Sequence, residues 1–491
     1  MEYFLGLDIG TTSLKSIAFS RDGKILCEHS ISYPIRHPFP EWSEQDPEEI
    51  LMAVVKTVEN ILQDLSPYIP VLCCFSSAMH SLIAIDKSGK PISPSIIWAD
   101  NRAAEIAGRI ISGNQARELY KRTGLPVHAM SPFCKLKWLK ENQPEIFNKA
   151  FKFIGIKEWI FFRLFGIYVV DISIAAATGL MNIQTLQWDP WILEQIGVSA
   201  DRLSEIVQIE KFFSSPVLFP SLTSVPFVIG GSDGAMANLG ASDEPGALVV
   251  TVGTSSAARL IVDKPQTDPD MRTFCYYIRN GQWLLGGASN NGGIVLQWLQ
   301  EDFFHSEKPV TDFLNQASRV QPGSDGLIFL PYLLGERSPI WNADARGVVF
   351  GLNINHGQAE MIRASLEAVI YCLFAISQPL FEKTAIQKIY ATGGFARNKI
   401  WLQILADVFN LPVLVSETIE NSAWGAAKCG MQALGISTSS EPAVSKMFYP
   451  DDSVHRIYAK GFQKFQRLYE LLKEEFIQTV TKESTGTQYS K

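Results

Sequence analysis

An apolar strand, a Gly-Thr turn and a second apolar strand occur in this order twice in the sequence. The first copy covers residues 4–19 with its turn at residues 10–12, and the second covers residues 247–262 with its turn at residues 253–254. Glycine lets the backbone turn sharply, and the N–H groups and hydroxyls of such a turn can face phosphate oxygens. The repetition predicts two domains that start with the same topology. For the first copy alone, an ordinary hairpin is an equally simple interpretation.

Carboxylates end two of the predicted strands. Asp8 closes the strand of the first copy, where the second copy has Thr251, and Asp233 follows an apolar strand at residues 225–229. Because Mg²⁺ prefers hard oxygen ligands and keeps several waters, we expect Asp8 to organise a metal-bound water shell beside phosphates. Asp233 lies in a Gly-rich turn and can accept the proton of an attacking hydroxyl. The plain alternatives are a turn residue for Asp8 and a turn residue or helix N-cap for Asp233.

The length of the chain agrees with this duplication. At 491 residues the sequence exceeds what a single hydrophobic core usually holds, so two domains are expected. We place an N-terminal domain at residues 1–243 and a C-terminal domain at residues 244–491, with a cleft between them. Residues 131–190 alternate helical patterns with Gly and Pro breaks, which indicates an insertion on the first domain.

Composition excludes several partners. A hydrophobic fraction of 46% and a charged fraction of 19% indicate a folded globular protein, and a net charge of −7 gives no support for nucleic acid or an anionic membrane as partner. The seven cysteines form no metal-ligand spacing, which fits a reducing compartment. With no signal peptide or membrane-spanning run predicted, the expected location is the cytoplasm. The sequence leaves the oligomeric state open and is compatible with a homodimer.

Two strand-to-helix turns follow in the C-terminal half. One is Gly393-Gly394 before the helix at residues 400–409, with Asn398 close by. The other is the start of a helix near residues 420–427, where Ser422 is a candidate N-cap and Gly425 allows close approach of a flat ligand or of another helix. No GxxxxGK[ST] or GxGxxG motif is present, so the two Gly-Thr turns at residues 10–12 and 253–254 predict triphosphate binding without a P-loop or a dinucleotide fold.

The order of these motifs resembles the FGGY family of carbohydrate kinases, which are relatives of actin, hexokinase and the Hsp70 ATPase domain. The motifs that carry the resemblance, spread over nearly the whole chain, are Asp8-Ile9-Gly10-Thr11-Thr12, Gly231-Ser232-Asp233-Gly234, Thr251-Val252-Gly253-Thr254-Ser255, Gly393-Gly394 with Asn398, and Ser422-Ala423-Trp424-Gly425-Ala426-Ala427. The resemblance implies an α/β fold of two ribonuclease H-like domains, with ATP and a sugar in the cleft between them.

The resemblance also implies roles for single residues. Asp233 matches the catalytic base, and Asp8 and Asp233 match the positions that organise Mg²⁺. The residues implied to bind ATP are Gly10, Thr11, Thr12, Gly253, Thr254, Gly393, Gly394 and Asn398, with Asn290, Asn291 and Gly292 as additional candidates near adenosine. Gly335-Glu336-Arg337-Ser338-Pro339 matches the family without a chemical role, and Asp171, Ser173 and Thr178 match without assigned contacts.

The acceptor is implied by a second group of residues. Met79, His80, Trp98, Asp100 and Arg102 fall where xylulose and gluconate kinases of the family contact the sugar. The stretch His80-Ser81-Leu82 is most like the gluconate branch, because a xylulose kinase more often has Gly where this chain has Ser81. His80 and Arg102 can also provide hydrogen-bonding or positive partners for a carboxylate. Without the family context, His80 is read as a core histidine and Arg102 as a solvated charge.

The leading hypothesis is therefore ATP-dependent phosphorylation of the terminal hydroxyl of D-gluconate, giving 6-phospho-D-gluconate. The first alternative is another sugar or polyol kinase of the family, with D-xylulose first. An alternative of another class is an ATP-driven protein-interaction ATPase of the actin and Hsp70 type. The polar residues at strand ends between residues 76 and 190 favour a small polar ligand over a protein partner.

Overall fold

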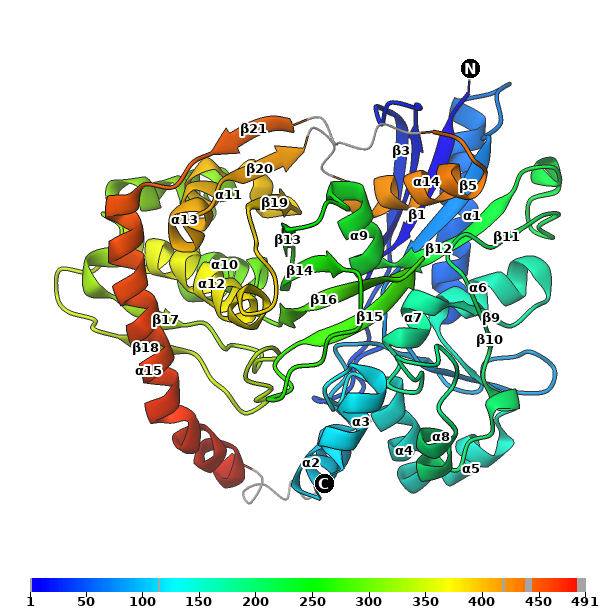
Figure 1. Cartoon of the computed structure of the whole chain (residues 1–491), viewed down its shortest axis with the longest axis horizontal. Helices are drawn as coiled ribbons and strands as arrows, with labels where there is room; N and C mark the ends of the chain where they lie inside the picture. The colour runs from blue at the N-terminus through cyan, green and yellow to red at the C-terminus, as the bar shows by residue number, and fades with distance from the viewer. Residues whose placement is uncertain (1, 114, 417–419, 438–443, 484–491) are drawn as a thin grey trace. The chain divides into compact units, whose positions relative to one another are not determined.

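The computed structural model describes residues 2–113, 115–416, 420–437 and 444–483 (Figure 1). The chain forms two compact units, and each contains several separate segments. The first unit consists of Met1–Asp243, Ile261–Leu285 and Glu420–Pro442, and the second consists of Glu244–Leu260, Gly286–Ile419 and Ala443–Lys491. A functional division into contiguous halves at residues 243 and 244 stays a prediction.

A six-stranded sheet organises the first unit. Its strands follow the order β11-β12-β5-β1-β2-β3, with β1 antiparallel to β2 and parallel to β5. These strands are β1 Phe4–Ile9, β2 Ser13–Phe19, β3 Ile25–Ser32, β5 Leu72–Ser77, β11 Phe212–Phe213 and β12 Phe227–Ser232. Because β1, β5 and β12 are parallel, their carboxyl ends meet at one edge of the sheet.

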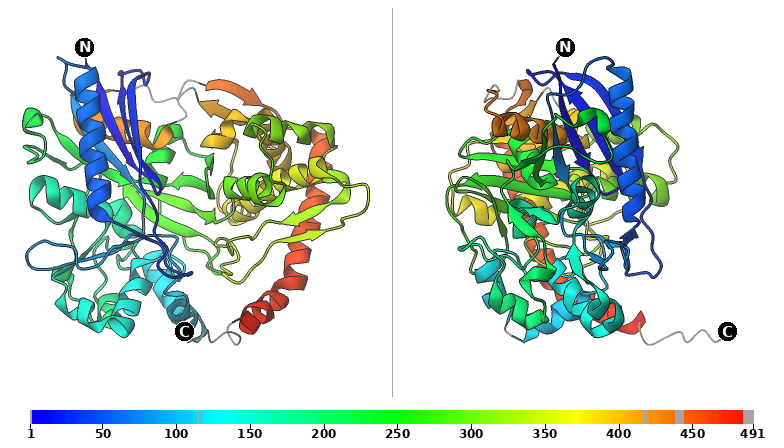
Figure 2. Two further views of the ribbon diagram at one scale, coloured as in Figure 1. Left: turned by 180° about the vertical axis from the view of Figure 1, so that it is seen from behind. Right: turned by 90° about the vertical axis from the view of Figure 1, so that its right-hand side faces the viewer.

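Helices cover both faces of this sheet. Helix α1 (Pro47–Asp64) begins at the N-cap Asp46 and packs on β2 and β3, whereas α14 (Asn421–Ala433) and α9 (Asp233–Ala241) lie on the opposite face (Figure 1, Figure 2). A Cβ on Gly425 would come within 1.9 Å of the Met236 carbonyl oxygen. Of the two partners proposed for Gly425, the structure therefore shows another helix.

The remaining elements of the first unit surround this sheet. Its other helices are α2 Ala104–Ser112, α3 Ala116–Thr123, α4 Pro132–Asn142, α5 Pro144–Lys149, α6 Ile156–Phe165, α7 Ile172–Ala176 and α8 Pro190–Ile196. Short strands pair as β4 (Glu44–Gln45) with β7 (Ser95–Ile96), β6 (Ile83–Ile85) with β8 (Lys152–Ile154), and β9 (Val169–Asp171) with β10 (Glu205–Val207). One apolar core lies between the sheet, α1 and α6, and another lies among α2, α4 and α8.

The second unit repeats the strand arrangement of the first. Strand β13 (Ala247–Val252) is antiparallel to β14 (Ser256–Val262) and parallel to β19 (Lys388–Thr392), which is parallel to β20 (Val413–Ser416). Strand β21 (Val444–Phe448) pairs with β20. Strand β15 (Phe274–Arg279) belongs to the first unit, and β16 (Gln282–Ser289) begins in the first unit and ends in the second. Thr251 pairs with Thr392 as Asp8 pairs with Ser76, so the predicted asymmetric duplication is present.

The helices of the second unit include a long apolar core helix. They are α10 Gly293–Trp298, α11 Val310–Asn315, α12 Gln358–Phe381, α13 Lys399–Phe409 and α15 Asp452–Glu483, and a short hairpin joins β17 (Ile328–Leu330) to β18 (Val348–Phe350). By length and composition α12 could cross a membrane, but 78% of its apolar window is buried inside the protein. Such burial is typical of a core helix.

Candidate functional site

The first strand delivers Asp8 to the carboxyl edge of the first sheet. Asp8 pairs across β1 and β5 with Ser76, whose Oγ donates a hydrogen bond of 2.8 Å to Asp8 Oδ1. The turn that follows is closed by a bond of 3.0 Å from Gly10 N to Ser13 O. Because Asp8 is only partly buried, its carboxylate can reach a ligand at this edge.

Asp8 and Asp233 are close enough for their charges to interact. The pKa of Asp8 is raised to about 6, first by burial and further by the carboxylates of Asp233 and Glu420, against the opposing effects of Ser76 and Lys15. Lys15 Nζ is 2.7 Å from Glu420 Oε2. The structure thus brings the two predicted acids to one place, and a cation there would relieve their repulsion.

A distorted strand end presents Asp233. Gly230 has a left-handed φ of 62°, and a Cβ there would lie 1.8 Å from the Phe75 carbonyl oxygen. The β12 register with β5 shifts between Val228 and Gly231, as in a β-bulge that redirects the following residues. Ser232 is the N-cap of α9, with its Oγ 3.3 Å from Ala235 N, so Asp233 is the first helical residue and not the cap.

Three buried side chains fix this strand end. Lys157 Nζ is 2.6 Å from Asp171 Oδ2 and donates to the carbonyl oxygens of Ile229 and Gly231 at 3.2 and 3.0 Å. Asp171 Oδ1 accepts from Ser173 Oγ at 2.5 Å, and Ser173 Oγ accepts from Ser232 N at 2.8 Å. Asp171 and Ser173, which had no assigned contacts, therefore position the backbone that leads into Asp233.

The turn at residues 10–12 is held by side chains from other elements. Tyr33 OH donates to Gly10 O at 2.6 Å, and Gln45 Nε2 donates to Thr11 O at 2.6 Å. Trp98 Nε1 donates to Thr11 Oγ1 at 2.8 Å. Trp98, which is predicted to contact the sugar, is therefore hydrogen-bonded to Thr11, which is predicted to contact phosphate.

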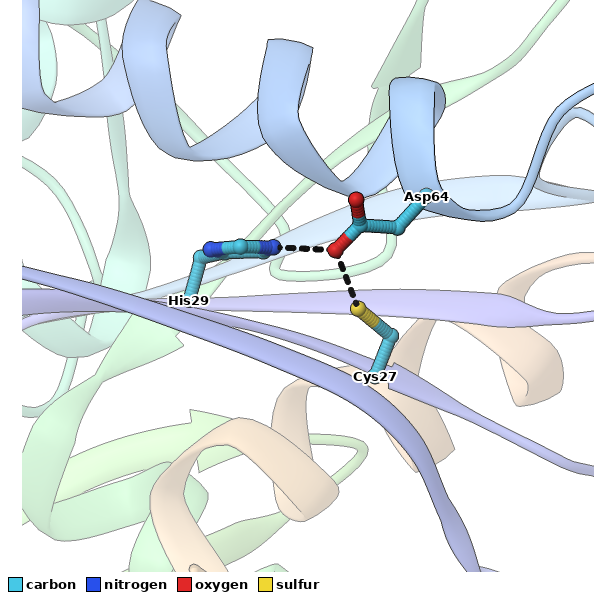
Figure 3. A group of neighbouring side chains, drawn as sticks. All are labelled: Cys27, His29 and Asp64. Atoms are coloured by element: carbon cyan, nitrogen blue, oxygen red, sulfur yellow. Dashed lines mark hydrogen bonds and ion pairs between the residues drawn. The ribbon is translucent and has the colours of Figure 1, made fainter.

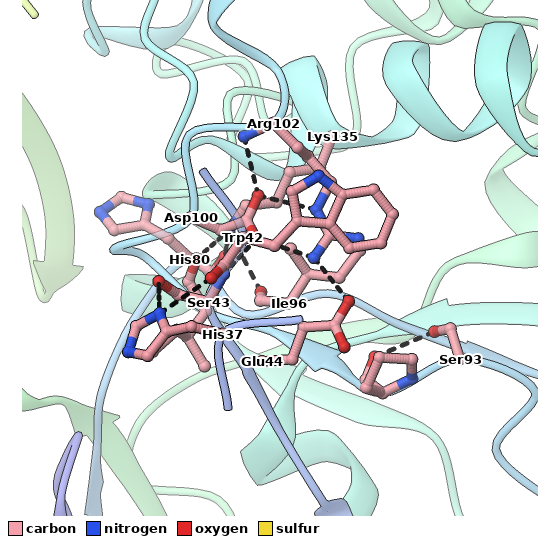
Figure 4. Close-up of polar contacts among 12 residues, drawn as sticks. His37, Trp42, Ser43, Glu44, His80, Ser93, Ile96, Asp100, Arg102 and Lys135 are labelled. Atoms are coloured by element: carbon pink, nitrogen blue, oxygen red, sulfur yellow. Dashed lines mark hydrogen bonds and ion pairs between the residues drawn. The ribbon is translucent and has the colours of Figure 1, made fainter. Parts of the chain in front are cut away.

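Asp100 and Arg102 belong to a buried polar cluster (Figure 4). Arg102 donates from Nε to Asp100 Oδ1 at 2.8 Å and from Nη2 to Asp100 Oδ2 at 2.8 Å and Glu44 Oε1 at 2.6 Å, and its guanidinium carbon is 3.7 Å from the centre of the Trp42 ring. The side chain is only 2% exposed. The interpretation of Arg102 as a solvated charge is wrong, and its ion pairs with Asp100 and Glu44 weigh against its service as the carboxylate partner of the acceptor.

His80 is held in an unusual conformation by a buried lysine. Its φ of 67° is in the left-handed region, which is rare for non-glycine residues and recurs at functional sites. Lys135 Nζ donates to the carbonyl oxygens of His80, Ile96 and Ile97 at 2.7, 3.2 and 2.8 Å. The ring of His80 faces Tyr276 at 6.5 Å between centroids. Lys135 thus fixes both segments that carry His80 and Trp98, while Met79, next to His80, is partly exposed.

The second unit contains a cavity of about 460 Å³ beside its own Gly-Thr turn. That volume is in the range of small-ligand pockets. Gly253, Gly394 and Asn398, three of the predicted nucleotide residues, line it with Gln297, Gln300 and Trp401. Asn398 also caps α13, with its Oδ1 accepting from Trp401 N at 3.0 Å. Gly393 has a φ of 92°, and a Cβ there would lie 2.6 Å from Val252 O.

The buried Glu336 holds residues 289–291, the segment that leads to the turn at Gly253, through hydrogen bonds. Glu336 accepts from Ser289 Oγ at 2.6 Å, from Asn290 N at 3.0 Å and from Asn291 Nδ2 at 3.3 Å. The chain then reaches Gly293, whose N–H donates to Gly253 O at 2.7 Å. Asn291 is fully buried and is not among the residues that line the cavity, and its contact with adenosine stays a prediction.

The sequence reasoning missed the residues that position others. Lys135 and Lys157 are buried charges, and no local motif distinguishes them from surface charges. Glu336 lies in the stretch Gly335-Glu336-Arg337-Ser338-Pro339, which was matched to the family without a chemical role. One signal was present for Lys135, since it lies between Phe133-Cys134 and Leu136 in an otherwise apolar stretch. A lysine at such a position is costly to bury unless its ammonium is satisfied.

Comparison with known proteins finds two domains of one family along this chain. The N-terminal domain of the FGGY family of carbohydrate kinases matches residues 3–240, and the C-terminal domain of that family matches residues 248–434. A gluconokinase of Bacillus subtilis (strain 168) is 45% identical over 462 residues, which is 91% of this chain and 90% of that protein.

Two solved structures from Lactobacillus acidophilus are also similar. A gluconate kinase has a TM-score of 0.92 at 34% identity, covering 97% of this chain and 99% of that one. A ligand-bound xylulose kinase has a TM-score of 0.93 at 34% identity, covering 98% of this chain and 100% of that one. The two structures therefore do not separate the two acceptors.

Proposed function

This chain belongs to the FGGY family of carbohydrate kinases, and we propose that it transfers the γ-phosphoryl group of ATP to the terminal hydroxyl of D-gluconate, giving 6-phospho-D-gluconate. Both the predicted resemblance and the predicted two-domain kinase fold are confirmed by the family matches and the similar structures. The observation that carries the choice of gluconate is the 45% identity to a gluconokinase over 91% of the chain.

The chemistry assigns different tasks to the two acids. As the bond from the γ-phosphorus to its bridging oxygen breaks, the acceptor oxygen attacks the phosphorus, and Asp233 takes the proton that this hydroxyl loses. Asp8 supplies a hard oxygen beside a second carboxylate, a donor set that fits Mg²⁺. When bound, Mg²⁺ neutralises charge on the transferring phosphates. The cavity beside Gly253 and Gly394 is proposed to hold the adenosine of ATP.

Other parts of the assignment are proposals of the same kind. The proposed sugar contacts are Met79, His80, Trp98, Asp100 and Arg102, of which Arg102 is already paired with Asp100 and Glu44. The proposed partner is a small sugar acid rather than nucleic acid or a membrane. The proposed location is the cytoplasm. The proposed function is compatible with either a monomer or a homodimer. D-xylulose stays the first alternative acceptor, since one similar structure is a xylulose kinase.

Incubation of the purified chain with MgATP and D-gluconate tests the proposal. We expect one ADP per phosphorylated product and a single phosphate monoester on the terminal carbon, detected by phosphorus NMR and mass spectrometry. ATP hydrolysis that is stimulated by peptides but not by any sugar would favour the protein-interaction ATPase instead. A product phosphorylated at another position would contradict the assigned reaction.

Substitution of Lys135 tests whether this lysine positions the backbone segments that carry the proposed sugar contacts His80 and Trp98. A charged ammonium has three N–H donors for its three carbonyl acceptors, and Lys135→Gln removes one of them. We expect a KM for gluconate about tenfold higher, the equivalent of ~1.4 kcal/mol, with the KM for ATP unchanged. Lys121→Gln, at an exposed lysine of α3, is the matched control. Equal changes in both KM values would indicate general damage instead of positioning.

The pH dependence gives a second readout for Lys135. Burial lowers its pKa to about 7, so the ammonium loses a proton, and with it one donor, as the pH rises through that value. The KM for gluconate should therefore increase between pH 7 and pH 9 in the wild type, and this increase should be absent in Lys135→Gln. A profile that is the same in both proteins would exclude Lys135 as its origin.

A further inference from the structure

Three potential metal ligands of the first unit, Cys27, His29 and Asp64, meet beside the end of α1 (Figure 3). Cys27 and His29 are two residues apart on the edge strand β3, and Asp64 is the last residue of α1. Cys27 pairs with Ala18, whereas Ser30 pairs with Lys15, the partner of Asp8. Cys27 is thus displaced by three residues, ~10 Å, along the strands from Asp8 and His29 by one residue, and both lie two strands away across the sheet.

The strand geometry explains why these side chains meet. Residues two apart on a strand point to the same face of the sheet. Cys27 and His29 are partly buried on the face covered by α1, and the exposed residue between them in the sequence points to the other face. The pairing between β2 and β3 shifts between Ala18 and Phe19, opposite Cys27 and Ile25, as a β-bulge does. Bulges redirect the side chains beside them.

The distances fit one small ion. His29 Nε2 is 2.8 Å and Cys27 Sγ is 3.6 Å from Asp64 Oδ2, and one ligand atom from each residue lies within 4.8 Å of the others. Tetrahedral bonds of ~2.0 to 2.3 Å place ligand atoms roughly 3.3 to 3.6 Å apart. An ion in place of the shared protons therefore needs only small side-chain movements.

We propose that Cys27 Sγ, His29 Nε2 and a carboxylate oxygen of Asp64 form a binding site for a zinc-class divalent transition metal, with water as the fourth ligand. Thiolate, imidazole and carboxylate together match Zn²⁺ or Co²⁺, whereas Mg²⁺ and Ca²⁺ require oxygen ligands. Among the residues that the structure describes, this is the cluster of His, Cys, Asp and Glu that has such spacing.

The end of α1 adds an independent attraction for a cation. Carbonyl groups at a helix C-terminus carry partial negative charge, which favours positive ions. The last turn of α1, all of which lies in the described part of the chain, contains no basic residue, and Asp64 adds a full negative charge there. Binding would release the thiol proton and join the edge strand to the helix end, and so stabilise the folded unit by mass action.

Titration of the full-length chain with Co²⁺ tests this site. The protein is first stripped with a chelator, and excess Mg²⁺ is kept present without ATP so that oxygen sites are filled. We expect one equivalent of Co²⁺ to give visible bands of a tetrahedral ion and a thiolate-to-cobalt charge-transfer band, both displaced by Zn²⁺. The other six cysteines are buried, so a thiolate signal must come from Cys27.

Variants decide between a metal site and a surface ion pair. Cys27→Ser should remove the charge-transfer band, and His29→Gln and Asp64→Asn should each weaken binding at least tenfold, while kinase activity with gluconate is unchanged. Glu28→Gln, an exposed neighbour on the other face of β3, should bind as the wild type does. Zn²⁺ should also raise the Tm of the wild type and not that of Cys27→Ser. A charge-transfer band that persists in Cys27→Ser, or no saturable binding in the wild type, would overturn the proposal and leave a hydrogen-bonded ion pair.

Discussion

Replacement of Asp233 by Asn is expected to lower kcat for gluconate phosphorylation by roughly 10²- to 10⁴-fold, the usual contribution of a general base. Asn has nearly the same shape, and its Oδ1 can still accept the 2.7 Å hydrogen bond from Gly234 N, but it cannot take the proton of the acceptor hydroxyl. Because Ser232 and not Asp233 caps α9, the helix should remain intact.

The measurement is steady-state kinetics together with calorimetric titration of ADP. ADP affinity should stay within about threefold of the wild-type value, since the proposed nucleotide cavity is lined by residues of the second unit. Asp201→Asn, at an exposed acid of the same unit, serves as the matched control. A variant at residue 233 that kept more than a tenth of the wild-type kcat would remove this residue from its assigned role.

Asp8→Asn should have two opposite effects, a loss of activity and a gain in stability. Burial and the neighbouring carboxylates raise the pKa of Asp8 to about 6 from 3.8, so the ionised form destabilises the fold. At 1.36 kcal/mol per pKa unit this cost is at most about 3 kcal/mol, which a neutral Asn avoids while keeping the bond from Ser76. Activity should fall by at least about 10²-fold, because the proposed magnesium site loses its charge.

The sign of the pH dependence follows from the raised pKa. The folded chain binds the Asp8 proton more tightly than the unfolded chain does. The contribution of Asp8 to the free energy of unfolding is therefore stabilising below pH 3.8 and is lost as the pH rises through about 6. The variant should therefore unfold at a higher Tm than the wild type at pH 7, and the difference should shrink towards pH 4. Glu59→Gln, at an exposed residue of α1, should change neither property. A Tm at pH 7 that is lowered by Asp8→Asn would contradict the electrostatic explanation.

Local patterns were sufficient for the repeated strands and their turns. The strands at β1 and β2 and at β13 and β14 were predicted because apolar runs and Gly-Thr turns specify them over a few residues. The start of α1 is also specified locally, because Asp46 is its N-cap and Pro47 its first residue. In contrast, Ser422 is not the N-cap of α14, which begins at Asn421 after Glu420 without a side-chain cap. Gly425, in the second turn of this helix, packs closely against the backbone of α9.

Long-range charge pairing limited the prediction of the site. Arg102 pairs with Asp100, two residues away, and with Glu44, which is 58 residues away in the sequence. The local pattern did not show that the Arg102 side chain turns back onto Asp100, and the long-range pair with Glu44 depends on the fold. The same limit applies to Lys135, which serves three carbonyl groups from two segments. The positions of Asp8 and Asp233 were easier to infer, because the carboxyl ends of parallel strands share an edge.

Competition between acceptors tests the proposed function most directly. Equal concentrations of D-gluconate and D-xylulose are supplied with limiting MgATP, and the two sugar phosphates are counted by mass spectrometry, since their ratio is the ratio of the two kcat/KM values. We predict that 6-phospho-D-gluconate forms in at least tenfold excess. An excess of xylulose phosphate would contradict the assignment of gluconate, and the absence of both products would contradict the assignment of either acceptor.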